Sequence, residues 1–154
     1  MSAMTRVFDS VEELLTAEGE SFGPTDWTEI DQRRVDLFAE ATGDHQWIHT
    51  DPERAASGPF GRTIAHGFLT LSLLPRLLNE LYTVDNVRMG INYGLNKVRF
   101  PAPVPVGSKV RLAAEIASVR RGEGFVEVTV RSTLEVEGSA KPACVIESVG
   151  RLYP

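Results

Sequence analysis

The sequence predicts an α+β fold in which an antiparallel sheet curls around one buried helix. Helical patterns fill the first half of the chain, and alternating strand patterns fill the second half. Between them, the segment from His66 to about Tyr82 has helical spacing, and its first half is apolar around most of its circumference and is expected to be buried nearly all round. Because such a helix is buried rather than laid on an exposed surface, a sheet wrapped around it accounts for both halves.

Length and composition are those of an ordinary globular domain. The chain has 154 residues, of which 42% are hydrophobic and 24% charged, so we expect a single domain spanning residues 1–154. The net charge of -5 offers no electrostatic footprint for nucleic acid. The most apolar stretch, Phe68 to Leu74, is too short to cross a bilayer, and the first residues lack the pattern of a signal peptide. We therefore expect a soluble, cytoplasmic protein that binds neither nucleic acid nor membrane.

Two amphipathic helices are predicted before Gly43. Ser10 and Glu13 have the spacing of a capping box, which opens a short helix that runs to about Ala17. Asp31 is a good N-cap for the second helix, and Gly43 ends it. The apolar stripe of this second helix consists of Val35, Leu37, Phe38 and Ala41.

A loop and two more helices follow. Residues 44–49 show no clean period and are expected to form a loop. Asp51 and Pro52 have the pattern of an N-cap with proline at the first helical position, so a short helix is expected there. The next helix is the apolar segment from His66 to about Tyr82, in which Pro75 removes one hydrogen bond and is expected to produce a kink.

The second half has the alternating pattern of antiparallel strands. Between Val126 and Val136 the apolar residues share one parity and most charged residues the other, which predicts a long, half-buried strand. Further strands are expected at 89–100, 109–116 and 143–153. The segment that follows the first of these strands contains Pro101, Pro103 and Pro105, so it is expected to be irregular or to lie at an edge.

The residues that could carry chemistry gather ahead of the apolar helix, where all three histidines lie. One interpretation is a metal site, because His45 and His49 have the spacing of the zinc motif H-E-x-x-H; however, Gln46 replaces its glutamate and the segment is not helical in pattern, so we expect no metal. A second interpretation is structural, with Asp44 closing a turn and His49 bonded within a loop. A third is an acid–base pair, in which Asp44 and His49 share one water. The residues by themselves leave the last two open.

Three blocks of the sequence resemble a known family. The first block is Phe38-x-x-Ala41-Thr42-Gly43-Asp44-x-Gln46-Trp47-Ile48-His49, with Ala55 six residues beyond, and it resembles the hydratase-2 signature of the MaoC-like dehydratases, the (R)-specific enoyl-CoA hydratases. The second is Ile64-Ala65-His66-Gly67, at the start of the apolar helix, and the third runs from Phe100 to Gly107. The resemblance covers roughly Val35 to Val136.

This resemblance implies a single hot-dog domain, in which the antiparallel sheet wraps around a long central helix from about His66 to Tyr82. It also implies a homodimer, in which strands of two subunits pair and the active sites lie at or near the interface. In the family pattern, G-D-x-N-P-[LIV]-H, an Asn-Pro pair stands where this chain has Gln46 and Trp47. We expect this departure to change the shape of the substrate more than the chemistry.

The expected chemistry is the addition of water to an acyl thioester. Asp44 and His49 would hold the water, and the backbone N–H of Gly67, at the start of a helix, would stabilise charge on the thioester oxygen. His66 is expected to brace the turn. Gln46, Trp47, Phe68 and Arg99 are candidates for substrate binding, although large apolar residues are more often core and a strand arginine is more often solvated.

The resemblance therefore implies an (R)-specific enoyl-CoA hydratase that converts trans-2-enoyl-CoA to (R)-3-hydroxyacyl-CoA in fatty-acid metabolism. No cofactor is expected, because coenzyme A is part of the substrate. The same site would serve a 3-hydroxyacyl-ACP dehydratase, which acts on acyl carrier protein in fatty-acid synthesis. A non-catalytic acyl-binding hot-dog subunit is the alternative from another class, and a thioesterase is less favoured because the Asp44–His49 loop is not where its base is expected.

Overall fold

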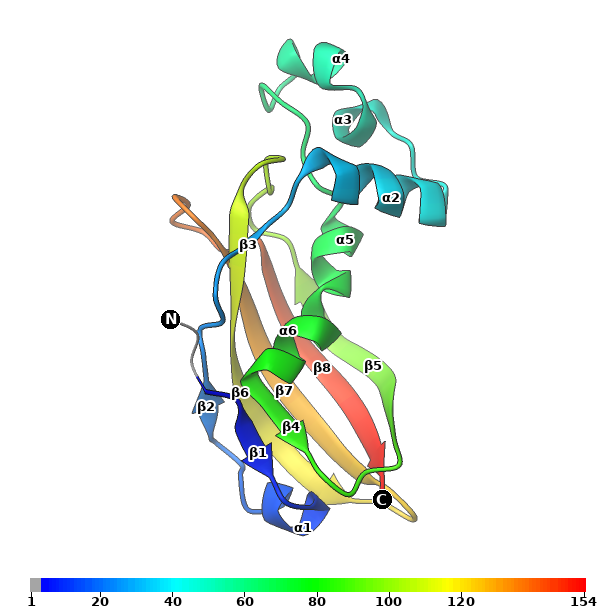
Figure 1. Ribbon diagram of the computed structural model, residues 1–154, viewed down its shortest axis with the longest axis vertical. Coiled ribbons are helices and arrows are strands. Elements are labelled where there is room, and N and C mark those ends of the chain that lie inside the picture. The colour runs from blue at the N-terminus through cyan, green and yellow to red at the C-terminus, as the bar shows by residue number, and fades with distance from the viewer. Residues whose placement is uncertain (1–3) are drawn as a thin grey trace.

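The carboxy-terminal half of the chain forms a strongly curved antiparallel sheet, as the computed structural model of residues 4–154 shows (Figure 1). Its long strands lie in the order β6-β7-β8-β5, and short strands β2 and β3 pair with the outer edge of β6. The long strands are β5 (Met89–Arg99), β6 (Lys109–Arg121), β7 (Val126–Val136) and β8 (Cys144–Tyr153), and the short ones are β2 (Ser21–Phe22) and β3 (Thr28–Glu29). The α+β class and the four long strands are confirmed, and β6 extends five residues beyond its predicted end at Ile116.

The alternation predicted for β7 is confirmed on its inner face. Val126, Val128 and Val130 are buried there, and Val128 and Val130 share the core with the central helices. Glu127, which was expected among the exposed residues of the opposite face, is also buried. Its carboxylate lies 2.7 Å from Arg120 and 3.1 Å from Arg151, so two guanidinium groups compensate its loss of solvent.

The central helix is present but divided in two. It consists of α5 (Gly67–Ser72) and α6 (Leu74–Leu81), which lie against the concave face of the sheet (Figure 1). The division falls at Leu73, two residues before Pro75, and this confirms the kink that the proline predicted. The first half was expected to be buried nearly all round, and this was wrong for Phe68, which is 69% exposed.

The last residue of the predicted central helix, Tyr82, instead begins a strand. Strand β4 (Tyr82–Val84) pairs in parallel with β1 (Arg6–Phe8), and this two-stranded sheet was not predicted. The side chains of Tyr82 and Phe8 meet edge to face at 6.0 Å between ring centroids. The pairing therefore ties the amino-terminal segment to the end of the central helix.

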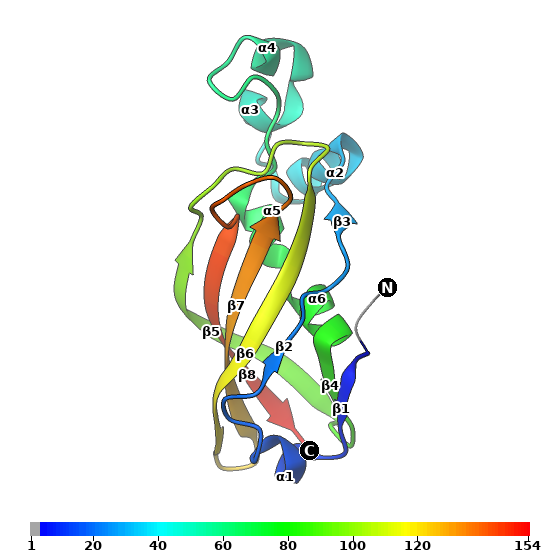
Figure 2. The ribbon, with the colours of Figure 1, turned by 90° about the vertical axis from the view of Figure 1, so that its left-hand side faces the viewer.

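Among the described residues, the helices that precede the central one are α1 (Val11–Leu14), α2 (Gln32–Thr42), α3 (Trp47–Thr50) and α4 (Pro52–Ala56). The predicted N-caps are confirmed, because Ser10, Asp31 and Asp51 each accept a hydrogen bond from a backbone N–H of the following turn. Gly43 ends α2 in the left-handed conformation, at a φ of +81°. Helices α2, α3 and α4 gather at the end of the sheet where α5 begins, whereas α1 lies at the opposite end (Figure 2).

Two details of these helices differ from the prediction. The buried face of α2 is formed by Val35 and Ala39, with Phe38 partly buried, whereas Leu37 and Ala41 are exposed. The predicted loop at residues 44–49 includes the first three residues of α3, so His49 lies on a helical turn. No helix in the part of the chain that the structure describes is long and apolar enough to span a bilayer.

Candidate active site

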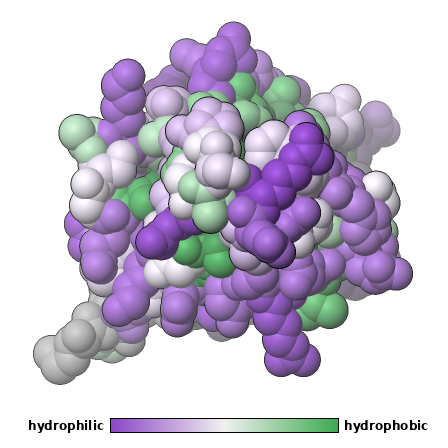
Figure 3. Space-filling model, turned by 90° about the horizontal axis from the view of Figure 1, so that it is seen from above, coloured by the Kyte–Doolittle hydropathy of each residue, from purple (hydrophilic) through white to green (hydrophobic). Residues whose placement is uncertain are grey.

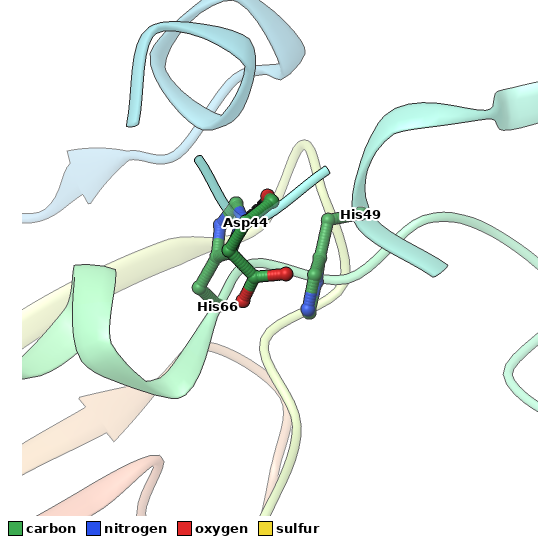
Figure 4. Close-up of side chains that lie close together, drawn as sticks. All are labelled: Asp44, His49 and His66. Carbon is green, nitrogen blue, oxygen red and sulfur yellow. Dashed lines mark hydrogen bonds between the residues drawn. The ribbon is translucent and has the colours of Figure 1, made fainter. Parts of the chain in front are cut away.

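Three side chains from separate segments meet at the amino-terminal end of the central helix. Asp44 lies in the loop after α2, His49 lies on α3, and His66 is the N-cap residue of α5. One carboxylate oxygen and one ring nitrogen from each histidine lie within 4.8 Å of one another. Figure 4 shows the carboxylate of Asp44 directed toward the ring of His49. The structure thus brings the predicted pair together and adds His66 to it.

A hydrogen bond to the main chain fixes which ring nitrogen of His49 carries the hydrogen. Its Nδ1 lies 2.7 Å from the backbone oxygen of Ile64. Because a carbonyl oxygen can only accept, Nδ1 carries the hydrogen, and Nε2 of the neutral ring is left as an acceptor. Burial lowers the pKa of His49, and the opposing effects of the Ile64 carbonyl and the Asp44 charge are smaller. A neutral imidazole with a free Nε2 is suited to accept a proton from water.

Asp44 is exposed, and its backbone is anchored by its neighbours. Its backbone oxygen accepts a hydrogen bond from Nε2 of His66 at 2.9 Å. Its Oδ1 lies 3.4 Å from the backbone nitrogen of Gln46, which turns the carboxylate back over the loop. The loop therefore presents Asp44 to solvent while its main chain is fixed to the start of α5.

His66 contacts His49 through its ring and Asp44 through a hydrogen bond. Its buried ring stacks on the ring of His49, with 4.0 Å between centroids and 25° between planes. The ring of Phe38 also lies against the ring of His66, with 4.9 Å between the two centroids. Since Nε2 of His66 donates to Asp44, Nδ1 of the neutral ring is an acceptor, and this buried atom has no hydrogen-bond partner. His66 thus contacts both members of the predicted pair.

The geometry of the cluster fits hydrogen-bond chemistry better than metal binding. The lone pairs of stacked imidazoles lie in nearly parallel planes, so they converge poorly on one ion at a bonding distance of about 2 Å. Nδ1 of His49 is already bonded to Ile64. The zinc-like spacing of His45 and His49 does not produce a shared site, because His45 points to Glu40, 3.8 Å away on the exposed surface.

Gly67 is the first residue of α5, next to this cluster. The first intrahelical hydrogen bond is made by the backbone nitrogen of Leu69, so the N–H groups of Gly67 and Phe68 precede the helical ladder. The ring of Phe100 lies against Gly67, where an added Cβ would come within 3.3 Å of it. Phe68 meets the same ring edge to face at 6.2 Å.

The other predicted substrate-binding residues are less closely connected to the cluster. Gln46 is exposed, and its backbone contacts Asp44. The ring of Trp47 packs under the guanidinium of Arg54 and against Gly58, where an added Cβ would come within 3.1 Å of it. Arg99 is exposed and donates to the backbone oxygen of Val98. The binding roles of these residues stay predictions.

Sequence reasoning missed two polar residues that contact this region. Gln32, at the start of α2, donates to the backbone oxygen of His49 at 2.8 Å and accepts from the hydroxyl of Thr63 at 2.7 Å. Nothing in the local pattern marks these residues, because their contacts span 17 and 31 positions of the chain. A glutamine directly after an N-cap is otherwise an ordinary helical surface residue.

A cavity of about 790 Å³ follows the central helix away from the cluster. It begins at Leu71, one helical turn beyond Gly67, and extends to Tyr82. Its walls are lined by apolar side chains from the central helix and the sheet, among them Leu71, Leu74, Leu78, Ile91, Val130 and Leu152. Seen from the end that carries α2 to α4, small hydrophobic areas lie recessed between hydrophilic side chains (Figure 3).

Comparison with known proteins identifies the fold and the family. A family model described as "MaoC like domain" matches residues 13–138. The chain is 64% identical over 147 residues to the 3-hydroxyacyl-thioester dehydratase Z of Mycobacterium tuberculosis, with 95% of this chain and 97% of the relative covered. It is similar in structure to the (R)-hydratase from A. caviae involved in PHA biosynthesis, with a TM-score of 0.70, 26% identity and 86% and 94% of the two chains covered. It also matches a monoamine oxidase regulatory protein from Archaeoglobus fulgius, with a TM-score of 0.78, 24% identity and 98% of each chain covered.

These matches and the geometry of the site define a hot-dog domain of the dehydratase and hydratase class, which are hydro-lyases. Because the family model matches most of its length, the chain belongs to the MaoC-like domain family. The family resemblance and the hot-dog fold expected from the sequence are thereby confirmed.

Proposed function

We propose that the chain is an (R)-specific enoyl-CoA hydratase of cytoplasmic fatty-acid metabolism, and that it adds water to trans-2-enoyl-CoA. The observation that carries this proposal is the pairing of the Asp44 carboxylate with a neutral His49 whose Nε2 is free to accept. This is the arrangement required to bind and activate one water. The R configuration is supported by the family and by the similarity to a solved (R)-hydratase.

In the proposed reaction, a water between Asp44 and His49 loses a proton to the pair, and its oxygen attacks C3 of the enoyl group. The electron pair of the double bond moves toward the thioester, and the proton that the pair took, or one equivalent to it, is delivered to C2. We do not divide the acid and base roles, because interacting groups titrate as a unit. No cofactor enters these steps; coenzyme A is part of the substrate.

The backbone N–H of Gly67 is the proposed donor to the thioester oxygen. Charge grows on this oxygen as water attacks, and a fixed donor stabilises it more in the transition state than in the ground state. Gly67 lies directly after His66, which contacts both Asp44 and His49. The proposed donor is therefore adjacent in the chain to a residue that contacts both members of the water-activating pair.

The alternative is a 3-hydroxyacyl-ACP dehydratase, which runs the same chemistry in reverse on acyl carrier protein. The relative from M. tuberculosis is a 3-hydroxyacyl-thioester dehydratase, a name that favours the dehydration direction and leaves the carrier open. Rates with matched acyl groups on coenzyme A and on acyl carrier protein distinguish the two. A rate on the carrier protein well above that on coenzyme A would favour the alternative.

The first test is hydration of crotonyl-CoA, followed by loss of its enoyl absorbance. We expect Asp44→Asn and His49→Ala each to lower the rate by at least about a hundredfold, as removal of an acid–base group does. His45→Ala is the matched control, because His45 is an exposed histidine of the same loop that points to Glu40. Near wild-type turnover in either site variant would contradict the mechanism. Binding of crotonyl-CoA by wild-type protein without turnover would instead favour a non-catalytic acyl-binding subunit.

We further propose that the chain acts as a homodimer in which two copies of β5 pair. Strand β5 is the last strand of the sheet, and Ile91, Tyr93 and Leu95 on it are exposed. An exposed apolar edge strand is a template for pairing with another chain. The same three residues line the cavity beside the central helix, so a second copy would also close the space proposed here for the acyl chain.

A further inference from the structure

His49 is part of a closed ring of hydrogen bonds that also includes Gln32, Thr63 and Ile64. Nε2 of Gln32 donates to the backbone oxygen of His49 at 2.8 Å, and Nδ1 of His49 donates to the backbone oxygen of Ile64 at 2.7 Å. The hydroxyl of Thr63 donates to Oε1 of Gln32 at 2.7 Å. The peptide bond between Thr63 and Ile64 completes the ring, which therefore fixes both the backbone and the imidazole of His49.

We propose that Gln32 and Thr63 are positioning residues that hold His49 in the tautomer and direction needed to accept a proton from water. This inference rests on the function proposed above, because it assigns a purpose to the orientation of His49. Neither residue touches the reacting atoms; both act through the helical turn that carries His49.

The amide of Gln32 can take only one orientation in this ring. A backbone carbonyl accepts but cannot donate, so the nitrogen end of the amide has to face His49. The second N–H of Nε2 lies 2.9 Å from Oδ1 of Asp36, and Oε1 accepts from Thr63. All polar ends of the amide are thus occupied, and the side chain acts as a spacer of fixed length between His49 and Thr63.

The turn that carries His49 depends on such external contacts. Helix α3 has four residues and no side-chain hydrogen bond at its N-cap, and a helix of this length is not stable by itself. It is tied to the segment after Thr63 by the bond from the backbone nitrogen of Ile64 to the oxygen of Ile48, 3.0 Å long. Gln32 provides its tie to α2. Asp44 is anchored separately by His66, so the ring controls His49 without controlling Asp44.

The kinetic experiment compares Gln32→Met and Thr63→Val with wild type on crotonyl-CoA. Both variants keep side-chain size but break the ring, so we expect kcat to fall by between about tenfold and about a hundredfold while KM stays nearly unchanged, since a displaced catalytic group loses rate rather than substrate affinity. Thr63→Ser keeps the hydroxyl and should restore most of the rate. Thr25→Val is the matched control, because Thr25 is also buried and hydrogen-bonded, to Leu112 of the sheet.

A second readout does not depend on activity. In wild-type protein, ¹⁵N NMR of the three histidine rings should show His49 with hydrogen on Nδ1. In Gln32→Met we expect signal from the Nε2–H tautomer, because the turn that carries His49 loses its tie to α2 and its imidazole is then held less firmly to the backbone oxygen of Ile64. A folded Gln32→Met protein with an unchanged His49 spectrum would overturn the inference. If the spectrum changes as expected but wild-type protein hydrates no thioester, the proposed function fails and the positioning of His49 stands.

Discussion

The side chain of His49 donates through Nδ1 to the backbone oxygen of Ile64, and the residue is only 7% exposed, so its burial favours the neutral ring. Burial removes the solvent that would stabilise the imidazolium ion and lowers the pKa of His49, an effect that the nearby Asp44 carboxylate only partly offsets. The ring of His66, stacked at 4.0 Å between ring centroids, also acts to lower the pKa of His49. A base prepared in this way stays available at pH values where an exposed histidine would be protonated.

Protein stability should therefore depend on pH through His49. The unfolded chain takes up a proton near the ordinary pKa of 6.5, whereas the folded protein takes it up only at the lowered pKa. Between these two values the unfolded state binds more protons, so the free energy of unfolding rises with pH across that interval and falls as pH decreases through it. Urea titrations at several pH values measure this slope. We expect His49→Gln to reduce it and His45→Gln, on the exposed surface, to leave it nearly unchanged; equal slopes in wild type and His49→Gln would contradict the assignment.

The residues of the candidate site differ in how far the sequence could predict them. Asp44 and His49 were predicted because they stand five positions apart in a recognisable block, and Gly67 because it begins an apolar helix. Gln32 could not be predicted, since its contacts join side chain to backbone across three separate segments. The stacking of His66 on His49 was missed for the same reason: it depends on how α3 meets the start of α5.

Among the elements, long segments followed their periodicity and short ones did not. The pattern of β7 extends over eleven residues and could be identified from alternation alone. Strands β1 to β4 have two or three residues each, too few to show a period. Strands β2 and β3 form because the longer β6 offers them an edge, whereas β1 and β4 pair with each other. On α2 the apolar residues did not show which face of the helix is buried, because Ala39 rather than Leu37 faces the tightly packed core.

At the start of α5, Gly67→Ala should separate stability from activity. The position is helical, where alanine is favoured over glycine, but its Cβ would crowd the ring of Phe100 at 3.3 Å. We expect the free energy of unfolding to change by less than about 1 kcal/mol, because these effects oppose each other. Alanine keeps the backbone N–H, but its methyl group would hold the thioester oxygen away from it, so on crotonyl-CoA kcat/KM should fall by about tenfold or more.

The control for this substitution removes the crowding. Phe100→Leu gives the new methyl group room. The double variant therefore separates hindered access of the thioester to the backbone N–H from a steric clash with Phe100. We expect the double variant to stay impaired while Phe100→Leu alone remains active. Unchanged kinetics in Gly67→Ala would contradict a role for this N–H.

In the whole molecule, one edge of the sheet is covered by short strands and, in the part that the structure describes, the other is not. The outer edge of β6 is covered by β2 and β3, whereas β5 pairs with β8 and ends the sheet among the described strands. The same strand lines the cavity with residues 90–95. Covering β5 with a second copy would bury its apolar residues and enclose the cavity in one step, so assembly and substrate binding are expected to be linked.

This link predicts that a charged side chain on β5 disrupts both dimer formation and substrate binding. Ile91→Lys places an ammonium group on the proposed dimer surface and at the cavity wall, where it cannot be buried without a partner. The expected result is a monomer in analytical ultracentrifugation, with turnover reduced most on long-chain enoyl-CoA because those acyl groups need an enclosed cavity. Val7→Lys is the control: Val7 is also a strand residue, is 45% exposed against 44% for Ile91, and lies on β1, which contributes no residue to the lining of this cavity. A wild-type protein that sediments as a monomer would contradict the dimer, and a dimeric Ile91→Lys protein would move the interface away from this edge.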